Sequence, residues 1–281
     1  MKKLLIICGP TATGKTNLAL AMAKKFDGEL VSADSRQVYK GLDALTGKDR
    51  SDEIPIWLYD VVTPTEEFSV AHFVRLAREA IADISKRGKL PIVVGGTGFY
   101  LRALTRPIET IAIRPDWALR RHIETLSLDA LQTLVGHHRL ERMNDSDKKN
   151  PRRLIRAIEV AMSESYIPSM NPSYDALWVG LTVSLAVLKE RIAQRVSGRF
   201  DMAVTEVCAG LPPILGVDPL LSYTHGEITK EEALKKWAQA EYQYAKRQMT
   251  WFRKEKAIHW FDVKNTDYQK GVEALARGWY T

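Results

Sequence analysis

The chain has 281 residues, enough for one large domain or two small ones with a core that needs no disulfide or metal. Its apolar fraction of 45% and charged fraction of 27% are typical of a soluble globular protein and exclude a disordered, collagen-like or coiled-coil chain. No apolar run reaches the length of a membrane-spanning helix, so we expect no membrane association. The two cysteines, Cys8 and Cys208, make neither a disulfide framework nor a zinc site, which favours a reduced, cytoplasmic protein.

Positive charge is concentrated in two segments of the chain. The formal net charge is +7; residues 114–156 hold 10 Lys and Arg against 6 Asp and Glu, and residues 235–256 hold 7 against 2. This distribution indicates a polyanionic partner such as a nucleic acid. Two solvated helix faces would give the same pattern, and charge alone does not decide between the two interpretations.

The first part of the chain alternates between predicted strands and helices. The continuous apolar run Lys3–Cys8 is typical of a buried parallel strand, and a glycine-rich turn separates it from a helix over Asn17–Phe26. A short strand is predicted over Glu29–Ser32. Another is predicted over Ile54–Val61, where Pro55 indicates an edge or a strand start.

A second series of helix and strand follows. Residues 69–87 have the apolar spacing of a helix, with Ser69 as its N-cap and Gly88 just after its end. Strands are predicted over Pro91–Val94 and Leu177–Val183, and a helix begins near Phe99. Repeated units of this kind predict an α/β fold with a parallel sheet and helices on both faces.

Residues 106–174 interrupt this alternation. They contain helical patterns, prolines and most of the first basic segment but no convincing strand, so we predict a mostly helical insertion. The core domain is then formed by residues 1–105 and 175–281. From Lys189 onward it is also predicted to be mostly helical, with a break at residues 210–219.

The strongest motif is the segment Gly9–Thr16, which matches the P-loop pattern G-x-x-x-x-G-K-[ST] of nucleotide- and ATP-binding proteins. It follows a predicted strand and opens a predicted helix, as this motif requires. Its backbone N–H groups favour a bound phosphate, Lys15 would neutralise phosphate oxygens, and Thr16 would place a hydroxyl on Mg²⁺. The predicted phosphate-binding residues are Gly9, Pro10, Thr11, Ala12, Thr13, Gly14, Lys15 and Thr16.

Two further strand ends carry candidate ligands. Asp34 follows the second strand and could hold Mg²⁺ or act as a base, with a loop or cap role as the alternative. The turn Gly95–Gly98 lies where α/β sheets bind ligands and offers the Thr97 hydroxyl, although a structural turn is the commoner reason for such glycines. Taken alone, these features fit a small-molecule kinase about as well as any other phosphate-dependent enzyme.

The combination of motifs resembles one family, the tRNA dimethylallyltransferases, also called tRNA isopentenyltransferases. The resemblance rests on five segments in the same order: Gly9–Thr16, Ser32–Asp43, Val94–Tyr100, Asn150–Val160 and Tyr244–Arg253. It implies a P-loop NTPase-like core. It also implies a reaction in which a dimethylallyl group passes from dimethylallyl diphosphate to N6 of adenine 37, next to the anticodon of a tRNA, with release of diphosphate.

The resemblance implies a set of reacting and donor-binding residues. Asp34 matches the catalytic carboxylate that accepts the proton of the adenine amine, and Thr97 matches a residue that contacts this adenine. With Lys15 they form the expected catalytic set. Arg191 and Arg195 match a stretch that lines the diphosphate pocket, and we expect Arg195 to bind the diphosphate together with the P-loop.

The resemblance also gives the basic segments a use. We expect the helical insertion to grip phosphates of the anticodon arm through its cationic helix, since phosphate contacts position a nucleic acid. The expected tRNA-binding residues are Asp34, Ser35, Arg36, Gln37, Thr97, Arg152, Arg153, Arg156, Lys246 and Arg247. Trp237 and Trp251 lie between the cations of the second segment, and their helical spacing favours a core role over base stacking.

Two stretches depart from the family pattern. The Gly-Tyr-Lys/Arg-Glu signature before the last helices is replaced by Gly216-Val217-Asp218-Pro219, and the region Val135–Arg139 lacks the usual Asp-Pro pair. An adenylate isopentenyltransferase, a P-loop kinase and a non-catalytic tRNA-binding protein therefore stay as alternatives. Nothing in the sequence indicates more than a monomer.

Overall fold

The computed structural model describes residues 1–163 and 174–280 and divides the chain into two compact units. Unit 1 comprises Met1–Arg106 and Pro172–Thr281, and unit 2 comprises Pro107–Asn171. The limits predicted for the helical insertion, 106 and 174, lie close to this division. Residues 164–173 of the predicted insertion fall outside the described residues.

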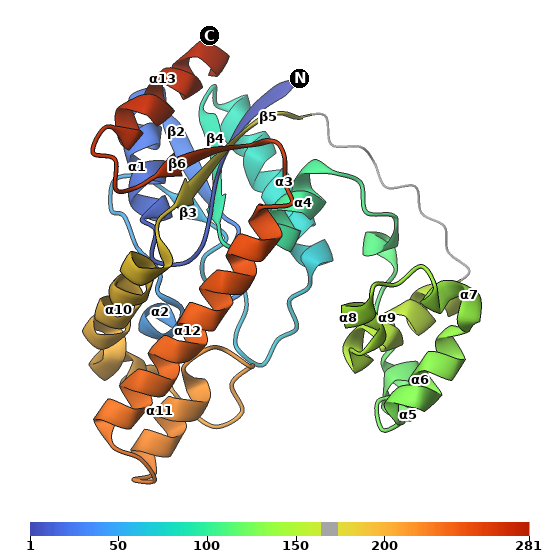
Figure 1. Cartoon of the computed structure of the whole chain (residues 1–281). Coiled ribbons are helices and arrows are strands. Elements are labelled where there is room, and N and C mark those ends of the chain that lie inside the picture. The colour runs from blue at the N-terminus through green and yellow to red at the C-terminus, as the bar shows by residue number, and fades with distance from the viewer. Residues whose placement is uncertain (164–173, 281) are drawn as a thin grey trace. The chain divides into compact units, whose positions relative to one another are not determined.

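Unit 1 is built on a parallel sheet (Figure 1). Among its described residues, six strands pair in the order β3-β2-β4-β1-β5-β6, and every pair is parallel. The predicted α/β class is therefore confirmed. The strands are β1 (Lys2–Cys8), β2 (Gly28–Ser32), β3 (Ile56–Trp57), β4 (Leu90–Gly95), β5 (Tyr174–Thr182) and β6 (Ile258–Asp262).

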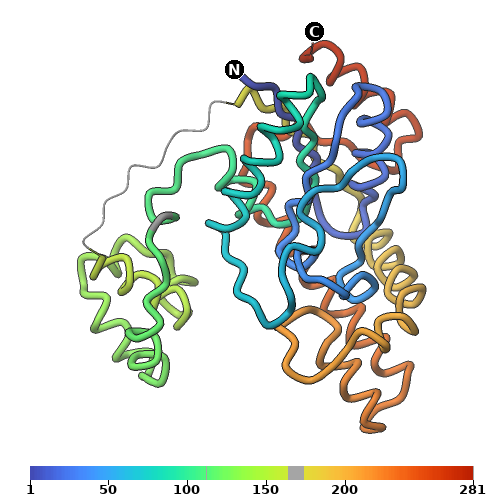
Figure 2. Tube along the Cα trace, turned by 180° about the vertical axis from the view of Figure 1, so that it is seen from behind, coloured from blue at the N-terminus to red at the C-terminus, as the bar shows by residue number. Residues whose placement is uncertain are grey.

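Helices cover both faces of this sheet. Successive side chains of a strand point to opposite faces, so Leu5 and Ile7 of β1 pack with α1 (Lys15–Phe26) and α13 (Tyr268–Tyr280). Leu4 and Ile6 are equally buried and point to the other face, where α3 (Val70–Lys86) contacts β2 and β4 and α4 (Gly98–Thr105) packs beside it. The same two layers are seen from behind in Figure 2. This two-sided burial explains why the strands are almost purely apolar.

Helix α3 begins and ends where its sequence predicts. The Ser69 hydroxyl accepts a hydrogen bond from the His72 N–H, and the His72 ring accepts one from the Ser69 N–H, which closes a capping box. At the other end, Gly88 has a φ of 77°, a left-handed conformation that glycine adopts without strain.

The structure differs from the predicted secondary structure at two strands. The strand expected over Ile54–Val61 is reduced to the two residues of β3, because Leu58 and Asp60 have positive φ angles that break an extended chain. The C-terminal region is mostly helical, as predicted, but its edge strand β6, which pairs with β5, was not predicted. The five residues of β6 are too short a run for a strand pattern to stand out from helical spacing.

The C-terminal helices form a second core beyond the sheet. Helices α10 (Leu185–Glu206), α11 (Val217–Thr224) and α12 (Lys230–Phe252) bury Phe200 and Trp237 together with the short helix α2 (Asp43–Thr46). The Glu206 carboxylate accepts hydrogen bonds from the Ala44 and Leu45 N–H groups at 2.8 and 2.7 Å, so α10 caps the N-terminus of α2. None of the described helices combines the length and apolar character needed to cross a membrane.

Unit 2 is helical throughout its described residues. Its elements are a 3-10 turn η1 (Glu109–Ala112) and the helices α5 (Trp117–Ile123), α6 (Leu128–Val135), α7 (His137–Leu140), α8 (Asp145–Lys148) and α9 (Pro151–Met162). A small core holds them together, in which Leu131 and Leu154 are fully buried.

A buried carboxylate, Glu159, ties α9 to the rest of unit 2. Glu159 accepts hydrogen bonds from Arg120 of α5 at 2.6 and 2.9 Å, from Arg156 at 3.1 Å, and from the Asp116 N–H at 2.9 Å. Burial alone would raise its pKa, but these hydrogen bonds outweigh burial and hold the pKa of Glu159 below its ordinary value. The carboxylate is therefore ionised in the folded protein and links α5 to α9 in addition to their apolar contact.

We expect Glu159→Gln to destabilise unit 2, because it removes the charge that two arginines surround. Arg120 and Arg156 are 27% and 31% exposed, so the loss should be about 2–3 kcal/mol, below that of a fully buried pair. A carboxylate whose pKa is depressed in the folded state stabilises the protein at pH values above the pKa that it has in the unfolded state. The difference in stability between wild type and Glu159→Gln should therefore shrink as the pH falls below about 4.

Hydrogen exchange of the amides in residues 117–162 at several pH values measures this effect. The matched control is Glu141→Gln, which neutralises an exposed carboxylate of the same unit. Equal protection in the two variants would contradict the role given to Glu159.

Candidate functional site

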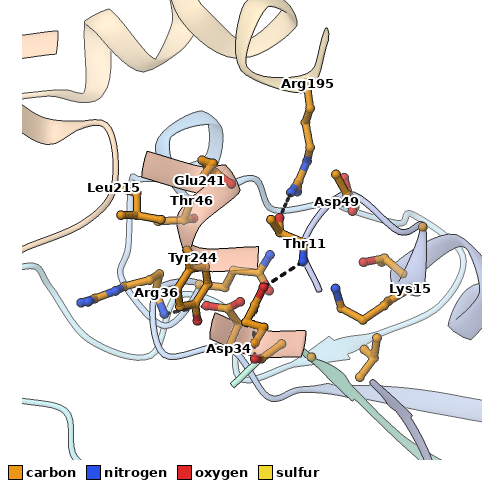
Figure 3. Close-up of a pocket in the computed structure, with 18 of the residues that line it drawn as sticks. Thr11, Lys15, Asp34, Arg36, Thr46, Asp49, Arg195, Leu215, Glu241 and Tyr244 are labelled. Atoms are coloured by element: carbon orange, nitrogen blue, oxygen red, sulfur yellow. Dashed lines mark hydrogen bonds between the residues drawn. The ribbon is translucent and has the colours of Figure 1, made fainter. Parts of the chain in front are cut away.

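A cavity of about 640 Å³ opens at the carboxyl ends of β1, β2 and β4, entirely within unit 1 (Figure 3). This is the edge at which parallel sheets bind ligands. The structure brings most of the predicted core residues to this one cavity. Those that line it are Thr11, Ala12, Gly14, Lys15, Thr16, Asp34, Arg36, Gln37, Arg191, Arg195 and Arg247.

The P-loop has the conformation that a phosphate site needs. Gly9 and Gly14 have φ angles of 136° and 83°, and a Cβ on Gly9 would lie 2.5 Å from the Leu181 carbonyl oxygen. Thr13 is buried, and its hydroxyl donates to the Pro10 carbonyl at 2.9 Å. No side chain caps α1 at Gly14, so the N–H groups of its first turn are available to an anion.

Lys15 lies inside this loop and is folded back along it. Its Nζ donates to the Pro10 carbonyl at 2.7 Å. Burial, followed by the nearby positive charge of Arg195, lowers the pKa of Lys15 to about 8. The Lys15 ammonium is thus held where its positive charge is unfavourable, and a bound anion would reduce this energetic cost.

Asp34 stands across the cavity from the P-loop. It lies two residues after the end of β2, and its Oδ1 accepts a hydrogen bond from the Arg36 N–H at 2.9 Å, which fixes the following turn. Ser32 donates to Gln37 at 3.0 Å, and Gln37 donates to the Gly47 carbonyl at 3.0 Å. The segment from Ser32 to Gln37 is therefore held from both ends while the Asp34 carboxylate lines the cavity.

Thr97 is joined to the same segment. Its Oγ1 accepts a hydrogen bond from the Ser35 N–H at 3.0 Å, and its own N–H donates to the Ala33 carbonyl at 3.2 Å. Tyr244 of α12 also lies beside Asp34 (Figure 3). Burial, followed by the Asp34 charge, raises the pKa of Tyr244 to about 12, so its hydroxyl keeps its proton at neutral pH.

The glycines of the turn after β4 are required by close packing within the protein and not by a left-handed backbone. A Cβ on Gly95 would lie 2.2 Å from the Ala33 carbonyl oxygen, one on Gly96 would meet the Gln248 amide, and one on Gly98 would meet the Trp251 ring. None of the three has a positive φ. All three allow close approach of the protein to itself without a left-handed turn, and Gly95 and Gly96 also line the cavity.

Helices α10 and α12 close the cavity on the side away from the sheet. Arg195 of α10 donates to the Thr11 hydroxyl and to the Gly47 carbonyl, both at 2.8 Å (Figure 3). Gln248 of α12 accepts from the Thr11 N–H and donates to the Gly96 carbonyl, both at 2.9 Å. The P-loop is thus held by two helices that follow it by more than 180 residues.

Several residues of this wall were not predicted from the sequence. Gln248 lies in the Tyr244–Arg253 motif, but no role was predicted for it. Asp49, Tyr59 and Glu241 also line the cavity and were not predicted from the sequence. The spacing of Glu241, Tyr244 and Gln248 is that of one helix face and could have grouped them. Trp237 is fully buried, and the core role predicted for it is confirmed.

The predicted tRNA-binding cations have different surroundings. Arg247 lines the cavity, and Lys246 is exposed on α12. In unit 2, Arg152 is exposed and Arg153 pairs with Asp147. Arg156 also donates to the Thr110 and Ile113 carbonyls at 2.8 Å, so it helps to hold unit 2 together.

The residues present fit a magnesium ion held jointly with a ligand. The Thr16 hydroxyl and the carboxylates of Asp34 and Asp49 line one cavity. Among the described residues, no group of three or more His, Cys, Asp or Glu side chains is placed to hold a metal. Magnesium commonly takes a hydroxyl and one or two carboxylates and completes its shell with substrate phosphate and water.

Comparison with known proteins agrees with this geometry. A family model described as IPP transferase matches residues 37–255, and another described as isopentenyl transferase matches residues 2–57. The chain belongs to the IPP transferase family. A relative from Pediococcus pentosaceus named tRNA dimethylallyltransferase is 38% identical and is aligned over 99% of this chain and 97% of its own. The resemblance seen in the motifs is confirmed.

Solved structures of this family share the fold. The tRNA isopentenylpyrophosphate transferase of Bacillus halodurans is 31% identical, with a TM-score of 0.73 over 99% of this chain and 97% of its own. A eukaryotic dimethylallyltransferase crystallised acting on tRNA is 24% identical and has a TM-score of 0.79 over 98% of this chain and 78% of its own. The P-loop NTPase-like core predicted from sequence is confirmed.

The depressed pKa of Lys15 predicts a pH-dependent affinity for diphosphate. Its ammonium attracts diphosphate only while protonated, so the affinity of the free protein should fall as the pH rises through about 8. Isothermal titration with inorganic diphosphate between pH 6.5 and 9.5 measures this. Because diphosphate itself titrates, the quantity to compare is the difference in diphosphate affinity between wild type and Lys15→Met at each pH. The variant should bind diphosphate weakly and should not show the fall in affinity near pH 8. Parallel profiles for both proteins would contradict the prediction.

Proposed function

We propose that this protein transfers the dimethylallyl group of dimethylallyl diphosphate to N6 of adenine 37 in a tRNA and releases diphosphate. The observation that carries the proposal is the placement of a P-loop and a carboxylate, Asp34, on one cavity in a member of the IPP transferase family. The relatives named tRNA dimethylallyltransferase align over nearly the whole chain, which favours a tRNA over a free adenine nucleotide and over a kinase substrate.

The P-loop side of the cavity suits the leaving group. Carbon–oxygen cleavage leaves the electron pair on the diphosphate and positive charge on the allylic carbon. The N–H groups of the loop, Lys15 and Arg195 stabilise the charge that develops on the diphosphate. Bound diphosphate would draw Lys15 away from the Pro10 carbonyl, which the ligand oxygens replace as its partner.

The Asp34 side suits the acceptor. The exocyclic amine of adenine is a weak nucleophile, and the N6–carbon bond forms as a proton leaves the nitrogen for the Asp34 carboxylate. The Thr97 hydroxyl is held by Ser35 at 3.0 Å beside this carboxylate and can contact the base. The adenine reaches such a site only when it is unstacked from the anticodon loop.

Magnesium is proposed as the cofactor. Thr16 would hold it together with the diphosphate, and Asp49 could add a carboxylate. When bound, the ion would neutralise diphosphate charge and favour its departure.

The tRNA is proposed to contact both units. In unit 1, Ser35, Arg36 and Gln37 follow the catalytic carboxylate directly, and Arg247 stands at the cavity wall with Lys246 next to it. In unit 2, Arg152 and Arg153 offer phosphate contacts on an exposed helix surface. We propose that a monomer is sufficient, acting in the cytoplasm where tRNA is its substrate.

Incubation with dimethylallyl diphosphate, Mg²⁺ and tRNA, followed by mass analysis of the nucleosides, tests the function. N6-dimethylallyladenosine at position 37 is the expected product. Its absence with active relatives as positive controls would overturn the proposal. A labelled phosphate transferred from ATP to a small molecule would indicate a kinase instead.

Asp34→Asn keeps the shape of the side chain but removes the proton acceptor. We expect kcat to fall by roughly 10²–10⁴-fold, the range for a general base, while tRNA affinity changes little. Single-turnover rates and tRNA binding measured on the same protein separate these effects. A parallel loss of rate and binding would make Asp34 a structural residue.

Removal of Arg152 and Arg153 should weaken binding of all substrate tRNAs alike. The slope of log affinity against log salt should become shallower, by about 0.7–0.9 for each phosphate that the protein no longer neutralises. Affinity for dimethylallyl diphosphate should not change, because that site lies in unit 1. Arg156 is left in place because it holds the Thr110 and Ile113 carbonyls, and its removal would destabilise unit 2. An unchanged salt slope in the double Ala variant would show that the tRNA docks elsewhere.

A further inference from the structure

One buried side chain, Gln248, bridges the two halves of the proposed site. Its Oε1 accepts from the Thr11 N–H of the P-loop, and its Nε2 donates to the Gly96 carbonyl, both at 2.9 Å. Gln248 is 5% exposed and lies on α12, so a third element joins the loop after β1 to the loop after β4. Both amide atoms are used, and neither can lose its partner without leaving a buried polar group unpaired.

The bridge continues to the catalytic carboxylate. Gly96 is covalently followed by Thr97, whose hydroxyl accepts from the Ser35 N–H at 3.0 Å, and Ser35 follows Asp34. Three hydrogen bonds therefore connect Thr11, on the diphosphate side, with the segment that holds the general base. The two hydrogen bonds of the Gln248 amide polarise each other, because an amide that accepts a bond donates a stronger one.

Only glycine fits at position 96 while the Gln248 bridge is formed. A Cβ on Gly96 would lie 2.2 Å from the Gln248 Nε2 and 3.3 Å from its Cδ. Arg195 donates to the Thr11 hydroxyl, so Thr11 is anchored to α10 as well as to Gln248 of α12. A bound diphosphate would order this loop and, through the amide, the turn that carries Thr97.

We propose that Gln248 is a positioning residue that couples the donor site to the acceptor site, so that dimethylallyl diphosphate binding raises the affinity for tRNA. The proposal rests on the proposed function. The first ligand orders the bridge, and the second ligand then binds to a site that has already lost part of its conformational freedom. Because such coupling is reciprocal, tRNA also raises the affinity for the donor by the same factor.

The test compares tRNA affinity with and without a donor that cannot react. The probe is dimethylallyl thiolodiphosphate, in which sulfur replaces the bridging oxygen, and the RNA is the anticodon stem-loop of a tRNA that the wild type modifies. In the wild type we expect the probe to tighten RNA binding at least about fivefold. In Gln248→Met, which keeps the length of the side chain but neither hydrogen bond, the two affinities should agree within about twofold.

Two further variants make the outcome specific. Gly96→Ala pushes the amide away from the opposite side and should lose the coupling in the same way. The matched control is Gln243→Met, the same substitution at an exposed position of α12, which should keep the wild-type coupling. Turnover by Gln248→Met should fall by on the order of 10–100-fold in kcat, because a small misplacement of reacting groups is costly.

Each outcome bears on one claim. A wild type without coupling, or a Gln248→Met protein that keeps it, overturns the inference even if the melting temperature has dropped, because a merely structural residue would lower stability and leave the affinity ratio intact. A wild type that forms no N6-dimethylallyladenosine overturns the proposed function instead.

Discussion

The register of the parallel sheet is the constraint on which the site depends. Cys8, the last residue of β1, pairs with Gly95 at the end of β4, and Ser32 at the end of β2 pairs with Val94. The three strands therefore end at the same level. The P-loop, the Asp34 segment and the Gly96–Thr97 turn leave the sheet side by side, although long stretches of sequence separate them. A shift of one residue in this register would move Asp34 away from the cavity.

The three loops pack so closely that only glycine, which has no side chain, fits at two positions. The Ala33 carbonyl lies against Gly95, and the Gln248 amide against Gly96. The hydrogen bonds that result, from Thr97 to Ala33 and from Gln248 to Gly96, consume backbone groups that strand ends leave without partners. The loops are thereby joined to one another, which helps to give the arrangement needed for a reaction between two bound substrates.

The fold and half of the site could be predicted because they depend on patterns of consecutive residues. The P-loop, Asp34 and the apolar strands depend on local pattern, and the sequence shows each of them directly. Tyr244 and Gln248 reach the wall through the packing of the distant helix α12, and no local pattern contains that information. Arg195 was expected only from the family resemblance. The edge strand β6 was missed because its neighbour β5, and not its own five residues, makes it a strand. Likewise, Arg156 and Glu159 lie three residues apart on one helix, but only the fold shows that Arg120 joins them.

The distribution of charge in the cavity gives a physical reason for its affinity for an anion. Burial and the charge of Arg195 lower the pKa values of both Lys15 and Arg199, so three cations stand close together in a poorly solvated place. Glu241 accepts a hydrogen bond from Arg199 at 3.2 Å and offsets part of this charge. Asp49 is exposed and acts at longer range. The cavity lining as a whole holds five cations, Lys15, Arg36, Arg191, Arg195 and Arg247, against three acids, Asp34, Asp49 and Glu241, so an excess of positive charge remains.

This excess of positive charge destabilises the protein when no anion is bound. A ligand with several negative charges removes that cost when it binds, and the diphosphate that leaves in the reaction carries more charge than the ester that entered. The same cations therefore favour the products of bond cleavage over the bound donor, which is the direction in which a transferase needs its electrostatic field to act.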